Sequence, residues 1–141
     1  MKIHLTRRYS FSASHRLHSA HLSEEENQRV YGKCNNPYGH GHNYVVEVAV
    51  SGPTDPATGM IANLGDLDAF VGREVIEPFD HKYLNEEVAE FRERVPTTEN
   101  LCIEIFHRLR AFPAAKLERV RLEETGLNSF EYLGENNGSL Q

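Results

Sequence analysis

The sequence of 141 residues lacks several features that define large classes of proteins. It has no apolar run of membrane-spanning length, and its first ten residues, MKIHLTRRYS, alternate instead of forming the apolar core of a signal peptide. The net charge is −6 and there is no basic stripe, which argues against nucleic-acid binding. We therefore expect a cytoplasmic protein with no membrane and no nucleic-acid partner.

Cysteine is also scarce, since the chain contains only Cys34 and Cys102. Two cysteines in a cytoplasmic protein are more often free thiols than a disulfide. Cys102 lies among leucine and isoleucine residues at helical spacing, so it is expected in the core. Cys34 lies in the stretch GKCNNPYGHGHNY, residues 32–44, which is rich in glycine and asparagine and contains two histidines. This stretch is predicted to place a free thiol beside potential metal ligands.

The chain does contain the pattern of one α+β domain over residues 1–141, without internal repeats. Periodicity and capping residues predict strands at 3–13 and 42–50, helices at about 64–78 and 98–112, and a hairpin of strands at 117–125 and 129–133. This order predicts a four-stranded antiparallel sheet with two helices packed on one face. Residues 16–41 show no clear period and are expected to form a long functional connection. The tail, about 135–141, is expected to be loose.

Three histidines are predicted to share the apolar face of this sheet. His40 and His42 are two residues apart at the start of a strand, so both point to the face that continues with Tyr44. His15 extends the apolar face of the first strand in the same way. Three histidines without an obvious fourth ligand are typical of an open catalytic zinc site. A structural zinc with Cys34 as fourth ligand, and histidines that lie in the core without a metal, are the alternatives.

Acidic side chains supply the candidate acid–base groups. Asp80 precedes His81, and a carboxylate beside an imidazole can orient it, although an aspartate that caps a turn is the commoner reason for such a pair. Glu124 continues the buried face of its strand and therefore needs a partner, either a protein donor or a ligand that carries N–H groups. Glu99 lies in the first turn of a predicted helix, where a negative charge is favourable on electrostatic grounds alone.

The order of several motifs along the chain resembles the 6-pyruvoyl-tetrahydropterin synthase family. The motifs are FSASHRL, GKCNNPYGHGHNY, DPATGM with NLGDL, DHKYLN, PTTEN and LEET, and the resemblance runs from about residue 3 to 135. It implies a tunnelling fold, in which the sheets of three subunits join into a barrel and two trimers stack as a homohexamer. It also implies active sites at subunit interfaces. Joining sheets would pair the edges that an isolated sheet leaves open.

The resemblance also implies roles for individual residues. It assigns one Zn²⁺ per subunit to His15, His40 and His42. It implies that Cys34 is the proton acceptor and that Asp80 and His81 form a charge relay.

For the substrate, the resemblance implies that Glu124 anchors the pterin ring and takes part in the relay. Thr98 and Glu99 match the segment that lines the pterin pocket. The cations Arg16, Lys33 and Lys82 are candidates to contact a triphosphate.

The reaction implied by the resemblance converts 7,8-dihydroneopterin triphosphate to 6-pyruvoyl-tetrahydropterin with elimination of triphosphate, which is a lyase reaction. Electrons move within one molecule, so neither nicotinamide nor flavin is required, and the chain contains no Gly-rich phosphate fingerprint. One alternative is 6-carboxytetrahydropterin synthase of queuosine biosynthesis, in which three residues typically separate the cysteine from the histidine, against five here. The other is a non-catalytic oligomer that binds pterin or zinc and has no need of Cys34, Asp80 and His81.

Overall fold

A computed structural model describes residues 2–135 of the chain as a sheet with helices on one side. The strands are β1 (Ile3–His15), β2 (His40–Gly52), β3 (Lys82–Tyr83), β4 (Lys116–Thr125) and β5 (Asn128–Tyr132). The α-helices are α1 (Glu24–Tyr31), α2 (Leu64–Val71), α3 (Glu77–Phe79), α4 (Leu84–Glu87) and α5 (Thr98–Leu109). Three further helical turns, η1 (Gly32–Asn35), η2 (Gly72–Ile76) and η3 (Ala89–Phe91), complete the elements.

The sheet has five strands in the order β3-β1-β2-β4-β5. The two predicted antiparallel pairs, β1 with β2 and β4 with β5, are confirmed. The prediction of a four-stranded, wholly antiparallel sheet is wrong, because β3 adds a short strand parallel to β1. A strand of two residues is too short to produce an alternating pattern, and β3 forms where the backbone N–H of His81 donates to the carbonyl of Ser12.

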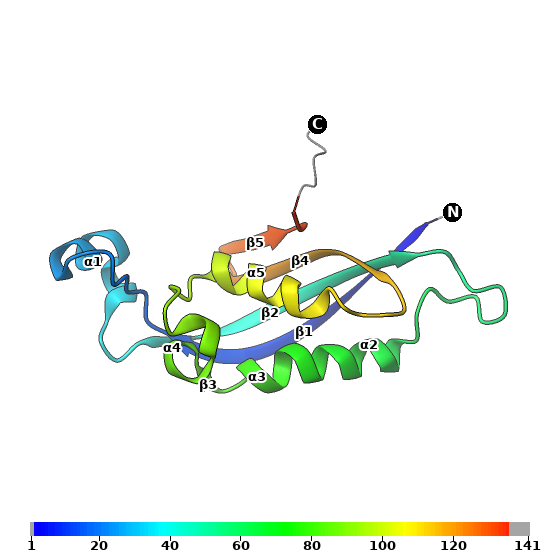
Figure 1. Cartoon of the computed structure of the whole chain (residues 1–141), viewed down its shortest axis with the longest axis horizontal. Coiled ribbons are helices and arrows are strands. Elements are labelled where there is room, and N and C mark those ends of the chain that lie inside the picture. The colour runs from blue at the N-terminus through cyan, green and yellow to red at the C-terminus, as the bar shows by residue number, and fades with distance from the viewer. Residues whose placement is uncertain (1, 136–141) are drawn as a thin grey trace.

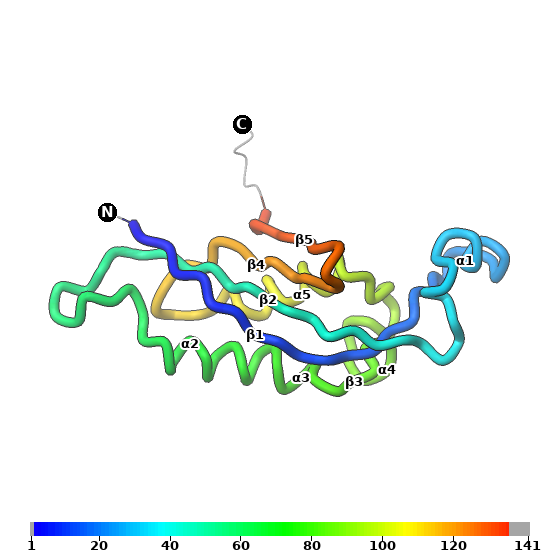
Figure 2. The backbone as a smooth tube through the Cα atoms, turned by 180° about the vertical axis from the view of Figure 1, so that it is seen from behind, coloured from blue at the N-terminus to red at the C-terminus, as the bar shows by residue number. Residues whose placement is uncertain are grey.

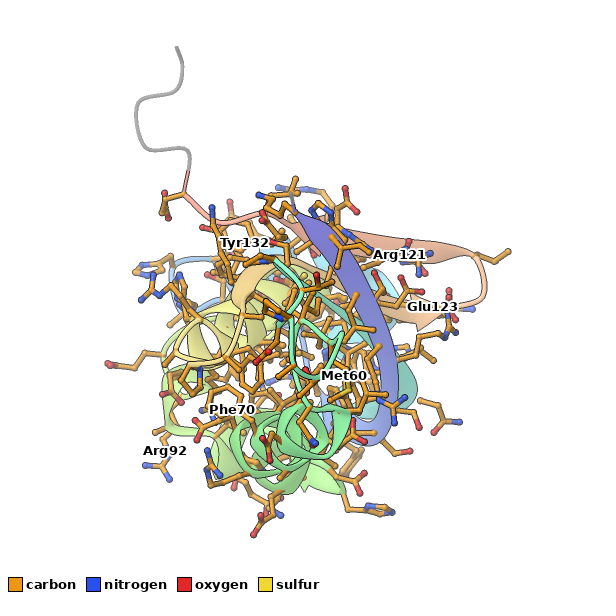
Figure 3. The ribbon with its side chains drawn as sticks, turned by 90° about the vertical axis from the view of Figure 1, so that its right-hand side faces the viewer. Met60, Phe70, Arg92, Arg121, Glu123 and Tyr132 are labelled. Atoms are coloured by element: carbon orange, nitrogen blue, oxygen red, sulfur yellow. The ribbon has the colours of Figure 1, made fainter. Side chains whose placement is uncertain are left out.

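Helices cover one face of the sheet and leave the other face open, as predicted. In Figure 1, α5 lies across β4 and β2, and the run from α2 to α3 lies along β1. The view from behind shows β1, β2 and β4 with no helix in front of them (Figure 2). Figure 3 shows Arg121 and Glu123 on the open side, away from Phe70 on the helical side.

The helices begin where their capping residues predict. The Asn63 side chain accepts from the backbone N–H of Asp66, and the Thr97 side chain accepts from that of Asn100. The first helical run passes Pro78 and ends at Phe79, one residue later than predicted. Apolar side chains of both runs and of alternate strand positions form the core, and Cys102 lies within it as predicted.

The connection between β1 and β2 contains helix α1, which sequence periodicity did not predict. The helix sequence EEENQRVY has no apolar stripe, and a capping box between Ser23 and Glu26 starts it. The buried side chain of Asn27 accepts from the N–H of Ser19 and donates to the carbonyls of Ser19 and Ser23. Polar contacts therefore hold α1, which lies beyond the end of the sheet (Figure 1).

Two other expectations concern the ends of the chain and the membrane. The predicted loose tail falls largely on residues 136–141, which lie outside the described residues. Within residues 2–135, no helix combines the length and the apolar character needed to cross a membrane.

Candidate active site around three histidines

The three predicted histidines meet at the end of the β1–β2 ladder. His15 pairs with His40 in the sheet register, and His42 is opposite Ala13. One ring nitrogen from each histidine lies within 4.8 Å of the others. The Nε2 atoms of His15 and His40 are 3.2 Å apart. The prediction that these side chains share one face is confirmed.

The hydrogen bonds and protonation of the histidines fit a metal centre. The Nδ1–H of the fully buried His15 donates to the carbonyl of Pro96 over 2.8 Å, which leaves the Nε2 lone pair directed at His40. Burial lowers the pKa of His15 to about 4 and also lowers that of His40, with a contribution from His42. The buried Nδ1 of His40 has no hydrogen-bond partner among the described residues. Neutral imidazoles with facing lone pairs are the donor set that binds Zn²⁺.

Cys34 stands beside this centre on the helical turn η1. Its half-buried side chain lines a cavity of about 830 Å³ together with Lys33, His40 and His42. Both cysteines are free, as predicted. Within residues 2–135, Cys34 is not among the ligating atoms that converge, which disfavours a structural zinc with four protein ligands. Burial, with the charge of Glu124, raises the pKa of the Cys34 thiol, so the chain alone keeps it protonated.

Glu124 points to the helical side of the sheet, and its partners are now identified. Its Oε2 lies 3.6 Å from Nε2 of His42 and accepts from the Thr98 hydroxyl over 2.5 Å, while its Oε1 accepts from Nδ2 of Asn128 over 3.1 Å. Burial opposes ionisation of Glu124, but these two hydrogen bonds and the nearby histidines together hold its pKa below the usual value. The sequence predicted the orientation of Glu124 and missed Asn128, which reaches it across the β4–β5 turn.

Asp80 and His81 form a pair directly before strand β3. Asp80 Oδ1 accepts from the N–H of Ser12 and lies 3.0 Å from Nδ1 of His81, and these contacts lower the pKa of Asp80. The His81 side chain is 82% exposed and lines a second cavity of about 450 Å³, which Cys34 does not line. Within one chain, the predicted relay residue His81 and the predicted base Cys34 therefore line different cavities, and His42 lines both.

The remaining candidates are dispersed. Glu99 is exposed in the first turn of α5, whereas the neighbouring Thr98 is buried against Glu124. Among the three predicted triphosphate contacts, Lys33 lines the cavity of Cys34, and Lys82 lines the cavity of His81. Arg16 lines a third cavity of about 440 Å³.

The loop between Cys34 and His40 turns at a glycine that the geometry requires. Gly39 has a φ of 75°, and a Cβ at this position would lie 3.0 Å from the carbonyl oxygen of His15. Its N–H donates to the carbonyl of Asn36 over 2.9 Å. The absence of a side chain thus lets the loop close against the end of β1, next to the histidines.

Known proteins share this fold and about half of this sequence. A family model described as 6-pyruvoyl tetrahydropterin synthase matches residues 4–135. A 6-pyruvoyl tetrahydrobiopterin synthase from Poecilia reticulata is 52% identical over 133 residues, 94% of this chain and 90% of that protein. The Homo sapiens protein of the same name is 49% identical over 132 residues, 93% of this chain and 91% of its own. The structure of Caenorhabditis elegans 6-pyruvoyl tetrahydropterin synthase has a TM-score of 0.91 at 41% identity and covers 96% of this chain and 97% of its own. The chain belongs to the 6-pyruvoyl tetrahydropterin synthase family.

Proposed function

We propose that the chain is a zinc-dependent 6-pyruvoyl-tetrahydropterin synthase, a lyase that converts 7,8-dihydroneopterin triphosphate to 6-pyruvoyl-tetrahydropterin and triphosphate. The observation that carries the proposal is the convergence of His15, His40 and His42 beside Glu124, with Cys34 lining the same cavity as two of them. The comparisons supply the substrate and product, because the similar proteins carry the names of this activity.

In this proposal the three histidines hold one Zn²⁺, and the remaining side chains bind the pterin or move protons. A bound Zn²⁺ supplies Lewis-acid chemistry toward hydroxyl groups of the substrate. Glu124, held as an anion by Thr98 and Asn128, accepts N–H groups of the pterin ring and fixes its orientation. Cys34 takes a proton from the substrate side chain once positive charge at the centre offsets the raised pKa of the thiol.

The proposal includes assembly of the chain, because Cys34 and His81 line different cavities within one copy. The exposed His81 of the Asp80–His81 pair lines a different cavity from Cys34, so we assign the pair to the site of a neighbouring copy. Strands β3 and β5 are the two edges of the sheet, and among the described residues no further strand pairs with either of them. Each edge can therefore pair with a strand of another copy. A homohexamer built as a dimer of trimers is the assembly that the family resemblance implies.

The decisive experiment follows turnover of 7,8-dihydroneopterin triphosphate by zinc-loaded protein, with products resolved by mass. The wild type is expected to give the 6-pyruvoyl product, and Cys34→Ala is expected to bind zinc without turnover. A 6-carboxy product would assign the chain to the related queuosine enzyme. Tight pterin binding without turnover by the wild type would make it a binding protein, and loss of zinc from Cys34→Ala would favour the structural zinc site.

A further inference from the structure

The helical turn η1, which carries Cys34, is hydrogen-bonded to the two residues that directly follow His15. The N–H of Leu17 donates to the carbonyl of Cys34 over 2.8 Å. In the opposite direction, Nδ2 of Asn35 donates to the carbonyl of Leu17 over 2.8 Å. The Nε–H of Arg16 donates to the carbonyl of Asn35 over 3.0 Å. Three hydrogen bonds therefore couple the thiol turn to the end of the strand that carries a histidine ligand.

Asn35 makes the one side-chain contribution from η1 to this attachment. Its side chain is buried, with 7% of the residue exposed, and its Nδ2 also lies 3.3 Å from Nδ1 of His18. A buried amide group that loses its hydrogen-bond partners destabilises the structure around it. Asn35 faces the carbonyl of Leu17, which can only accept a hydrogen bond. The contact therefore requires the N–H donor of the amide group.

The segment to which Asn35 is bound is itself held from the other side. Asn85 in α4 accepts from the N–H of Arg16 over 2.8 Å and donates to the carbonyl of the same residue over 2.8 Å. The Asn85 side chain thus pairs with Arg16 in the way that a neighbouring strand would. With Arg16 fixed, a bond from Asn35 to Leu17 limits movement of Cys34 relative to His15.

We propose that Asn35 is a positioning residue that holds the Cys34 thiol at its catalytic position in the cavity beside the three histidines. That the position of the thiol matters for catalysis rests on the proposed function, whereas the hydrogen bonds that hold it are a property of the folded chain. Asn35 lines the same cavity as Cys34, and the proposed role is that it acts through Cys34 by the bond that its amide donates to Leu17. Because a misplacement of about 1 Å at a catalytic group costs about 100-fold in rate, loss of this attachment should act mainly on kcat.

A matched pair of variants tests the proposal. Asn35→Asp retains the shape of the side chain but replaces the donor to Leu17 with an oxygen that repels the carbonyl. Asn36→Asp adds the same charge one residue further along, where the exposed side chain accepts from the N–H of Tyr38 and needs no donor there. Both variants are made in the full chain and loaded with zinc. Because both add one negative charge, a difference between them reports the loss of the Asn35 amide donor.

Two measurements are made on each variant. For turnover, Asn35→Asp is expected to lower kcat by about 10- to 100-fold relative to Asn36→Asp, with KM unchanged within about twofold. For the thiol, iodoacetamide is added to the pterin-free protein and modification of Cys34 is followed by peptide mass. Release of the turn exposes the half-buried sulfur, so Cys34 is expected to react several-fold faster in Asn35→Asp than in Asn36→Asp, while the buried Cys102 stays unmodified in both.

The outcomes separate this proposal from the proposed function. Equal alkylation rates and equal kcat in the two variants would overturn the role of Asn35. If even the wild type does not turn over the substrate, the proposed function fails, and the alkylation rates still decide whether Asn35 holds the thiol. If Asn35→Asp does not fold, Asn85→Asp replaces it, since it loses the donor to Arg16 outside the turn. Faster alkylation of Cys34 in Asn85→Asp supports the attachment, and a rate equal to that of the wild type overturns it.

Discussion

The Nε2 atoms of His15 and His40 lie 3.2 Å apart because their residues are direct partners in the β1–β2 ladder. In the neutral state, hydrogen bonding to Pro96 places a lone pair on the Nε2 atom of His15. The sheet therefore brings a donor atom to His40 before any ion binds, so binding needs little reorganisation of β1 or β2.

Zinc is expected to bind with a stoichiometry of one per chain and to raise the thermal midpoint of unfolding, because it binds the folded centre. His40→Ala should weaken zinc binding more than the 10- to 100-fold that is usual for loss of a supporting residue. Zinc content by elemental analysis and affinity by competition with a chelator measure this. His4→Ala, which changes an exposed histidine of the same sheet, is the control. Stoichiometric zinc in His40→Ala would remove this histidine from the centre.

Glu124→Gln is expected to lower kcat/KM by about 10- to 100-fold, which corresponds to loss of one charge-assisted hydrogen bond to the pterin. Glu123→Gln provides a close control, because Glu123 is the preceding residue and points to the open side of the sheet (Figure 3). Steady-state kinetics of both variants at one zinc loading measure the difference. An equal loss of kcat/KM in Glu123→Gln would mean that activity depends on the negative charge of this strand end and not on the position of Glu124.

Mixing two inactive variants tests whether neighbouring copies share a site. Cys34→Ala and His81→Ala are each expected to lack activity. After they are unfolded together at equal amounts and refolded, random assembly gives about one quarter of the sites a native Cys34 and a native His81 from different chains. Activity near that fraction of wild type is expected, whereas no recovery in correctly assembled mixtures would place both residues in one chain's site.

Asp68 is expected to make stability depend on pH in the acid range. Arg7 donates to both oxygens of Asp68 over 2.8 and 2.9 Å, and the Tyr9 hydroxyl donates over 2.8 Å. These hydrogen bonds lower the pKa of Asp68 to about 2, below the value of the unfolded chain. The stabilisation is therefore complete above about pH 4 and is lost as the pH falls toward 2.

Thermal unfolding of metal-free protein from pH 2 to 6 measures this effect. The midpoint of the wild type is expected to exceed that of Asp68→Asn most above pH 4, with the difference shrinking as the pH falls. Asp66→Asn, which changes an exposed carboxylate in the same helix, is the control. A constant difference across this range would show that Asp68 contributes through packing instead of charge.

Local patterns in the sequence predicted most of the sheet and the face on which the three histidines and Glu124 lie. Alternation along two strands was enough to place His15, His40 and His42 on one face, and the same rule oriented Glu124. The rule fails where structure depends on partners distant in sequence. Strand β3 exists because two of its residues reach β1, and Asn128 reaches Glu124 through a turn.

Side-chain amides were the other class that the sequence could not predict. Asn27, Asn35 and Asn85 each bond to backbone groups outside their own helical element, and nothing in the spacing of an asparagine reveals which carbonyl it will contact. The separation of His81 from Cys34 is of the same kind. Both residues belong to motifs that resemble those of the family, but the cavity that His81 lines depends on how β3 lies against β1.

The direct pairing of His15 with His40 also limits how the length of this chain can change. Strands β1 and β2 are both 13 residues long and remain in register up to the histidines. Removing one residue between Phe11 and His15 would turn the imidazole of His15 to the opposite face of the sheet. Insertions are better accommodated in the connection 53–63 at the far end of the ladder, because an insertion there leaves the faces of His15, His40 and His42 unchanged. In this protein, tolerance to changes in strand length is therefore expected to increase with distance along the ladder from the three-histidine cluster.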